Sequence, residues 1–411
     1  MGKIISYELA KFFKKRKNKL LVLALFMFVL AVNIYNYKLY KDYKDSFIEE
    51  YKQISEHAKV KLQNLNNELR GYSQWGENER LIYEERIHEI EGMINYLEVE
   101  ASVTGRISNA YRKVEDPQWN SLLCKYLKER YTNLVESYEK GFIDDVYLRE
   151  RKSNIEEARY YLYKYDYFLN NNILLKENKY QPSGVNSINL LFRDSNILIL
   201  VIIIALLSMD IFLAPVLEGS YKIEYTYPLE RKSIFIAKLI SILLISFGII
   251  IVLSLLSFII NSMIFGIGDF YYPQVVSGNI NKLTLKANEG NFTVISLSHK
   301  IVLGFVMIIA LTIFTVAFII FLSIFTDSIG KTLRITMVFI LAAFTFHVIA
   351  GKESLVNLWY PYMYCYYDNV ISGFYRSNYL FGLVMNISLG ILFIFISYFK
   401  FTGKDFLGVR E

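Results

Sequence analysis

The chain alternates between long apolar stretches and strongly polar blocks. Six stretches lack Asp, Glu, Lys and Arg, apart from one interruption at Asp210, for about the length that a helix needs to cross the roughly 30 Å core of a bilayer. They cover residues 20–37, 195–217, 239–268, 301–326, 335–351 and 377–399. A helix in a soluble core is rarely apolar on every side over such a length. The pattern therefore predicts an all-α polytopic membrane protein with six transmembrane helices.

The first two spans are separated by a polar block, residues 38–194, that has the periodicity of helices. Apolar residues recur every three or four positions in 47–72 and 83–97, and again after Pro117 and around 155–168. Helix breaks are predicted at 71–76, near Gly105, at Asp116–Pro117 and at Gly141. The block is thus predicted to be a helical, coiled-coil domain whose first and last helices form an antiparallel stalk.

The distribution of basic residues predicts the orientation of the spans. With the N-terminus inside, the cytoplasmic segments contain 16 Lys and Arg against 7 Asp and Glu, whereas block 38–194 contains 24 against 27. Cytoplasmic loops carry an excess of Lys and Arg, so both termini are expected in the cytoplasm and the protein in the plasma membrane. The cytoplasmic segments are 1–19, 218–238, 327–334 and 400–411, and the extracellular ones are 38–194, 269–300 and 352–376.

Residues 1–19 have the pattern of an amphipathic helix that lies in the membrane interface. Ile5, Leu9, Phe12 and Phe13 form one apolar stripe, and lysines occupy much of the remaining surface. Because such lysines face anionic headgroups, membrane lipids are expected partners. The alternative is a basic flank that only anchors the first span.

The sequence lacks the motifs of nucleotide-hydrolysing enzymes. Gly330-Lys331-Thr332 is similar to the end of a phosphate-binding loop, but Phe325 occupies the position of the required glycine. ATP hydrolysis is therefore not expected of this chain.

Metal and thiol chemistry are not expected either. His88-Glu89 lacks the second histidine of a zinc-protease helix. Cys124 and Cys365 are interpreted as free thiols, since two cysteines do not make a disulfide framework. We expect no metal site and no bound cofactor.

Two ionisable residues lie inside the apolar stretches. Asp210 is a candidate functional group, with a solvated position near the cytoplasmic end of its span as the alternative. His347 is interpreted as a packed or hydrogen-bonded residue. In block 38–194, tyrosines such as Tyr160 and Tyr161 are interpreted as packing residues, with ligand contact as the alternative.

The cytoplasmic segment 218–238 has the signals of a short helix joined rigidly to two spans. Glu218 and Ser220 can cap a helix over about 220–227, and Pro228 ends it. Such an element can transmit a push from a soluble partner into the membrane, and an ordinary solvated connector is the alternative. The residues assigned to this coupling role are Glu218, Gly219, Ser220, Glu224, Pro228, Arg231 and Lys238.

On these residues the chain resembles the ABC-2 type transporter permeases. The family's loop between the second and third spans contains an acid, a Gly-Ser or Gly-Thr pair, and then a proline, an arginine and a lysine. Here the acid adjoins the glycine, whereas in the family it usually stands a few residues earlier. The basic N-terminus, the six spans and the charged tail 400–411 also agree, and the long insertion 38–194 is typical of only some branches. The matching residues are Glu218, Gly219, Ser220, Pro228, Arg231 and Lys238.

The resemblance implies the permease subunit of a bacterial ABC exporter. Its partners would be a cytosolic ABC ATPase, which holds ATP and Mg, and a second permease that is identical or related. Segment 218–231 would be the coupling helix, and the cargo a lipid, glycan, peptide or drug. Nucleic acid is not an expected partner. Abundant Lys, Asn, Ile and Tyr suggest an AT-rich genome, which would suit a Gram-positive bacterium.

Two other functions stay open at this point. The stalk-like insertion is also compatible with an ATPase-coupled mechanotransmitter or sensor that acts on a cell-envelope partner without transport. An ion-coupled carrier would need buried charges along several spans, and Asp210 alone does not meet that requirement.

Overall fold

The structure of the protein is a computed structural model in which helices dominate. It describes residues 2–73, 83–151, 154–176, 179–193, 195–212, 230–280, 283, 291–326, 328–350 and 354–403.

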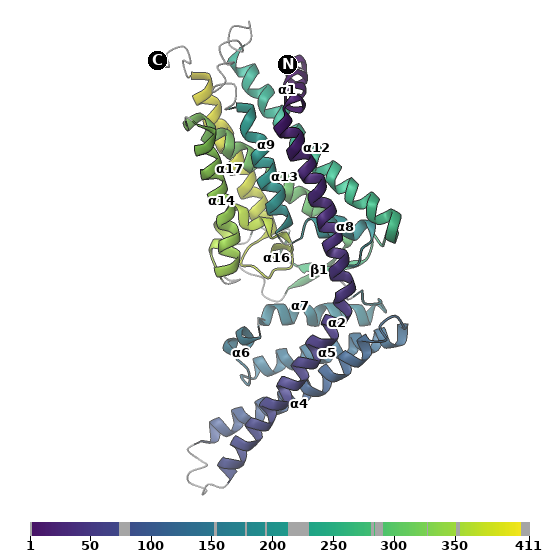
Figure 1. The fold of residues 1–411 in the computed structure, drawn as a ribbon. Coiled ribbons are helices and arrows are strands. Elements are labelled where there is room, and N and C mark those ends of the chain that lie inside the picture. Colours follow the sequence, from purple (N-terminus) through teal and green to yellow (C-terminus); the bar gives the residue numbers. More distant parts are fainter. Residues whose placement is uncertain are drawn as a thin grey trace. The chain divides into compact units, whose positions relative to one another are not determined.

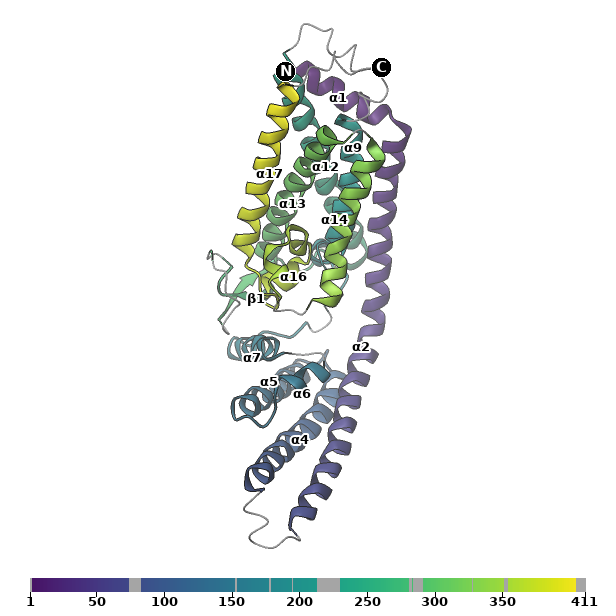
Figure 2. The ribbon, with the colours of Figure 1, turned by 90° about the vertical axis from the view of Figure 1, so that its left-hand side faces the viewer.

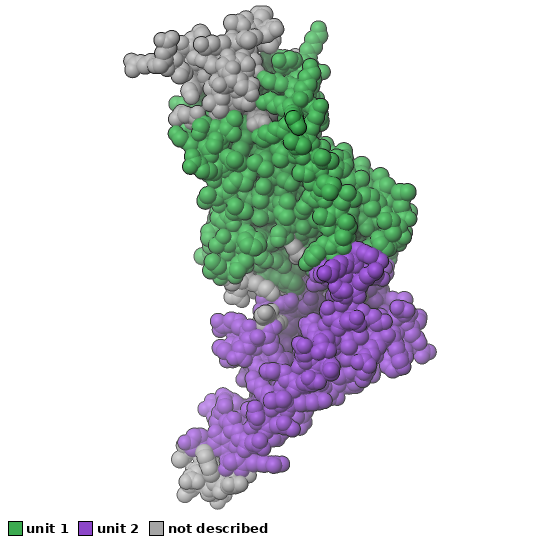
Figure 3. All heavy atoms as spheres, viewed as in Figure 1, with its two compact units in different colours: residues 1–36, 182–288, 293–411 green, residues 37–181, 289–292 purple. Residues whose placement is uncertain are grey.

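The chain divides into two compact units (Figure 3). Unit 1 contains residues 1–36, 182–288 and 293–411, and unit 2 contains residues 37–181 and 289–292. One helix, α2 (Arg16–Ser73), begins in unit 1 and continues without a break into unit 2. The division separates the apolar spans from most of the polar block.

Unit 1 is a bundle of long apolar helices with short elements between them. Besides the first part of α2 it contains α1 (Gly2–Lys14), α8 (Gly184–Leu191), α9 (Asn196–Phe212), α12 (Arg231–Phe265), β1 (Pro273–Ser277), β2 (Phe292–Ser296, whose first residue belongs to unit 2), α13 (Leu297–Phe325), α14 (Ile329–Ile349), α15 (Val356–Trp359), the 3₁₀ helix η1 (Pro361–Cys365), α16 (Tyr367–Ile371) and α17 (Tyr379–Gly403). Helix α13 lies inside this bundle and contacts α9, α12, α14 and α17 (Figures 1 and 2).

Among the described residues, five helices are long and apolar enough to cross a membrane. These are α2, α12, α13, α14 and α17. The pair α8 and α9 passes the same test only as one broken span, since the two helices meet at a bend of 67°. The chain is therefore a polytopic helical membrane protein, and the sixth span stays a prediction.

Three short segments differ from the sequence-based expectation. Helix α14 begins at Ile329, so most of the predicted turn 327–334 is helical, with the Ser328 side chain accepting from the amide of Lys331 at 3.2 Å. The predicted polar loop 269–300 contains the strands β1 and β2, which pair in a two-stranded sheet, so the fold is not purely helical. Val275 and Val276 suit a strand because they are β-branched and buried.

The third difference concerns residues 352–376, which were predicted to be an extracellular loop. In the structure α15, η1 and α16 fold into the core of unit 1, and Tyr362 and Tyr364 are fully buried. Tyrosine can be buried here because its hydroxyl finds a backbone acceptor, as Tyr364 does at the carbonyl of Leu358, 2.9 Å away. The polarity of this tyrosine-rich segment therefore predicted a loop, whereas the segment forms part of the core of unit 1.

The described residues of unit 2 form the second part of α2 and four further helices. They are α4 (Glu84–Tyr111), α5 (Pro117–Glu139), α6 (Asp145–Glu150) and α7 (Ile155–Asn170). Helix α5 packs against both α4 and α7. Its start is fixed by Asp116, whose side chain accepts from the amide of Gln118 at 2.9 Å, and its end by Gly141 at φ +76°.

Two predictions for unit 2 were wrong. Helix α4 continues through Gly105, because a glycine costs a helix interior only about 1 kcal/mol and packing against α2 outweighs that cost. Nearby, the hydroxyl of Ser55 donates to the carbonyl of Ala101 at 2.8 Å. The predicted stalk lacks its second helix, since α7 ends at Asn170 and the described residues from there to Ser183 are not helical.

Candidate functional site

Most residues of the predicted coupling segment lie outside the described residues. This holds for Glu218, Gly219, Ser220, Glu224 and Pro228. Asp210 falls within α9, but its side chain also lies outside the described part of the chain.

The structure does describe the helix that follows the coupling segment. Arg231 is the first residue of α12, and Lys238 lies seven positions later on nearly the same helical face. Arg231 is half-buried and Lys238 is buried, so only the first of these two predicted residues lies near the surface.

The first two turns of α12 pack on the last turns of α17. The ring of Phe235 lies 5.7 Å from the ring of Tyr398 and 5.5 Å from that of Phe401, centroid to centroid. Phe235 itself is buried. A displacement of the segment before α12 would therefore act on two spans.

The apolar face of helix α1 packs partly on α12, so this face is not available to lipid over its whole length. Phe12 is buried, and Leu9 packs on the core of unit 1, but Phe13 is 53% exposed. Glu8, the one acid in a basic segment, is buried on the packed side. The apolar stripe of the predicted interfacial helix is thus divided between protein core and surface.

The other face of α1 is basic and hollowed. Tyr7, Lys11, Lys14 and Lys15 line a depression of about 310 Å³. The turn between α1 and α2 is held by Asn18, whose Nδ2 donates to the carbonyl of Phe12 at 3.1 Å. This face has the chemistry to contact phosphate groups.

Unit 1 also contains an ion cluster that the sequence analysis missed. Asp368 on α16 lies 2.7 Å from Nζ of Lys300 on α13 and 3.5 Å from Nε of Arg193, measured from its two carboxylate oxygens. Arg193 occupies the bend between α8 and α9. The cluster therefore joins three segments that are far apart in sequence, and only the position of each charge beside an apolar stretch could have suggested it.

His347 is a packed, hydrogen-bonded residue, as predicted. Its Nδ1 pairs with the hydroxyl of Tyr375, and its ring stacks on that of Tyr366 at 3.8 Å. Cys124 and Cys365 are buried thiols outside any disulfide, as predicted, and Sγ of Cys124 donates to the carbonyl of Tyr165 at 3.4 Å.

Unit 2 has a buried ion cluster of its own. Glu100 is 1% exposed, and its Oε1 lies 2.8 Å from Arg151 and 3.2 Å from Arg130. Burial alone would raise the pKa of Glu100, but the two guanidinium groups outweigh burial and lower it. The same cluster contains Tyr96, whose pKa burial raises well above its usual value. These groups hold α4, α5 and the end of α6 together.

The tyrosines of α7 pack against other rings, which supports the packing interpretation. Tyr161 stacks on Tyr131 of α5 with ring centroids 5.1 Å apart. The ring centroids of Tyr160 and Tyr163 lie 5.7 and 5.8 Å from that of Phe292.

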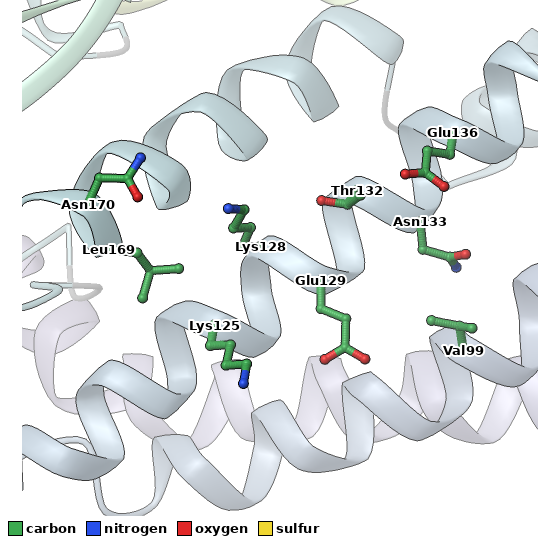
Figure 4. A pocket seen from close by; sticks show the side chains of 9 residues that line it. All are labelled: Val99, Lys125, Lys128, Glu129, Thr132, Asn133, Glu136, Leu169 and Asn170. Carbon is green, nitrogen blue, oxygen red and sulfur yellow. The ribbon is translucent and has the colours of Figure 1, made fainter.

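A groove runs along α5 in unit 2. Its volume is about 600 Å³, and nine residues of α4, α5 and α7 line it (Figure 4). Lys125 lies toward one end of the groove and Glu136 toward the other, with polar side chains of α5 between them. The sequence analysis did not identify this groove, because its walls come from three separate helices.

Comparison with known protein families gives a match over most of the chain. The model of a family described as ABC-2 family transporter protein matches residues 3–366. No curated protein and no solved structure matches the chain.

Proposed function

Because the chain belongs to the ABC-2 family of transporter proteins, we propose that it is the permease subunit of an ATP-driven exporter. The family match over residues 3–366 carries this proposal, since it covers most of the membrane helices as well as unit 2. Proteins of this family are membrane subunits that work with a separate ATPase and pair in the membrane. ATP and Mg are accordingly assigned to the ATPase chain.

The segment 218–231 is the proposed coupling helix, seated in a cleft of the ATPase. Its support comes from the residues that follow it. Phe235 ties the start of α12 to the end of α17, and α1 packs on α12, so a push on this segment would reach two spans and the N-terminal helix. Closure of the ATPase pair on ATP would then rock the spans toward an outward-open state.

The test measures ATPase stimulation in proteoliposomes that contain the chain and its ATPase. Glu218→Arg, Arg231→Glu and a deletion of 220–227 should abolish the stimulation while the chain remains inserted. Lys59→Glu reverses an exposed charge in unit 2 and serves as the control. Unchanged stimulation and unchanged co-purification of the ATPase in all three variants would overturn the docking role.

One observation favours a second function, that of a mechanotransmitter. Helix α2 has 58 residues, a length of about 87 Å, and contains no break between the two units. A continuous helix of this kind can transmit a displacement from the membrane to a domain outside it without moving a cargo.

The two functions differ in what ATP produces. Accumulation of a lipid, glycan or peptide in inverted vesicles, dependent on ATP and the ATPase, supports export. For the second function, spin labels are attached to cysteines introduced by Lys59→Cys and Leu244→Cys. A distance between the labels that changes with ATP, without accumulation of the lipid, glycan or peptide, supports transmission. Selective labelling is feasible because both native cysteines are buried.

A further inference from the structure

The groove along α5 has a balanced set of charges that are separated along its length. Two lysines, Lys125 and Lys128, and two glutamates, Glu129 and Glu136, line it. A polyanion would be repelled by the glutamates, and a neutral sugar would make no use of the opposite charges at the two ends. The lining therefore fits a ligand that carries both signs of charge.

Two of the four charged residues, Lys128 and Glu129, form ion pairs within unit 2. Nζ of Lys128 lies 2.6 Å from Asp166 on α7, and Arg106 of α4 lies 2.8 Å from Glu129. These pairs hold the two walls of the groove against α5, so the groove is formed before any ligand enters. Lys125 is exposed, and the ion-pair partner of Glu136 among the described residues is the exposed Lys140, at 3.8 Å.

The distance between the two ends defines the length of the ligand. Lys125 and Glu136 are eleven positions apart on one helix, which corresponds to about 16 Å. An extended peptide covers about 3.3 Å per residue, so about five residues span this distance. Between the ends, the hydroxyl of Thr132 can donate and accept, as a peptide backbone requires, whereas the amide of Asn133 offers its Oδ1 as an acceptor because its Nδ2 donates to the carbonyl of Tyr96 at 3.0 Å.

We propose that this groove binds a linear peptide of about five residues with free termini. The C-terminal carboxylate lies at Lys125 and the amino terminus at Glu136. The site is a property of unit 2 and does not depend on the exporter function. The peptide is a transported cargo in the first proposed function and a sensed signal in the second.

The experiment uses the full chain in nanodiscs, without an ATPase. The probe is a pool of linear pentapeptides with free termini, and the same pool acetylated at the N-terminus and amidated at the C-terminus serves for comparison. Retained peptides are identified by mass spectrometry, and the dissociation constants of the best ones are then measured. The variants are Lys125→Glu and Glu136→Lys, and the matched controls are Lys52→Glu and Glu56→Lys, which are exposed on α2. Circular dichroism shows whether each variant is folded.

The expected result is saturable binding of free-terminus peptides, weakened about fivefold or more by Lys125→Glu and by Glu136→Lys but not by either control. Amidation should weaken binding to the natural chain and have no further effect on Lys125→Glu. Equal retention of free and blocked pools, no retention of either pool, or equal weakening by the controls would overturn the proposal. Because no ATPase is present, these outcomes are independent of the exporter test.

Discussion

In unit 1, Nζ of Lys300 lies 2.7 Å from Oδ1 of Asp368, and this pair joins the first turn of α13 to α16. Both side chains are largely buried, at 11% and 22% exposed. The nearby hydroxyl of Tyr367 donates to the carbonyl of Lys300 at 2.5 Å, so the same two segments are joined twice. Removing one partner of a largely buried ion pair leaves the other charge buried without a counter-charge. The stability lost in this way is much larger than the net stability that the intact pair contributes.

We therefore expect Lys300→Met to destabilise the chain by about 2–3 kcal/mol, since of its two ion-pair partners among the described residues Asp368 would keep the more distant one, Arg193 at 3.5 Å. The denaturation midpoint of the purified chain in detergent measures this effect. Lys232→Met, at an exposed position on α12, should leave the midpoint unchanged. Equal midpoints for Lys300→Met and the natural chain would contradict the assignment.

Gly382→Ala should destabilise α17 although alanine is the better helix former. A Cβ at Gly382 would overlap the ring of buried Tyr364, and this clash outweighs the gain of about 1 kcal/mol in helix propensity. Gly248 on α12 has nothing within 4 Å of such a Cβ and provides the control. Thermal unfolding should show a loss for Gly382→Ala and none for Gly248→Ala, and the opposite order would refute the packing of η1 on α17.

Glu100→Gln should destabilise unit 2 by about 3–5 kcal/mol. The neutral side chain leaves the guanidinium groups of Arg130 and Arg151 buried without a counter-charge. Hydrogen exchange of α4 and α5 in the full chain should accelerate accordingly. The exposed neighbour Glu98, changed to glutamine, should alter exchange little, and similar exchange in both variants would argue against the buried cluster.

The same carboxylate gives unit 2 a defined dependence on pH. The pKa of Glu100 is lower in the folded chain than in the unfolded chain, where it is near the usual 4.5. Its stabilisation is therefore complete above the unfolded pKa and is lost as the pH falls through the folded pKa. The difference in unfolding free energy between the natural chain and Glu100→Gln should be constant near pH 7 and shrink below about pH 4.5. A constant difference down to pH 3 would contradict the lowered pKa.

The sequence predicted less of the candidate site than of the fold. Arg231 and Lys238 are the coupling residues whose surroundings are described; they are the first and eighth residues of α12, and their coupling role stays a prediction. The ion cluster at Asp368, the buried Glu100 and the α5 groove escaped prediction, because each combines side chains from helices that are distant in sequence. A pattern along one segment reports the environment of that segment only.

The sequence by itself determined the class of the protein. The length and composition of the apolar runs predict membrane helices, because a bilayer requires about 20 uncharged residues in every span. It also placed Pro117 and Gly141 at the ends of α5, because local backbone chemistry sets helix ends. Tertiary structure alone decided the course of residues 352–376, since whether a tyrosine is buried depends on a backbone acceptor supplied elsewhere. It likewise decided that α4 continues through Gly105, where packing against α2 outweighs the intrinsic cost of glycine.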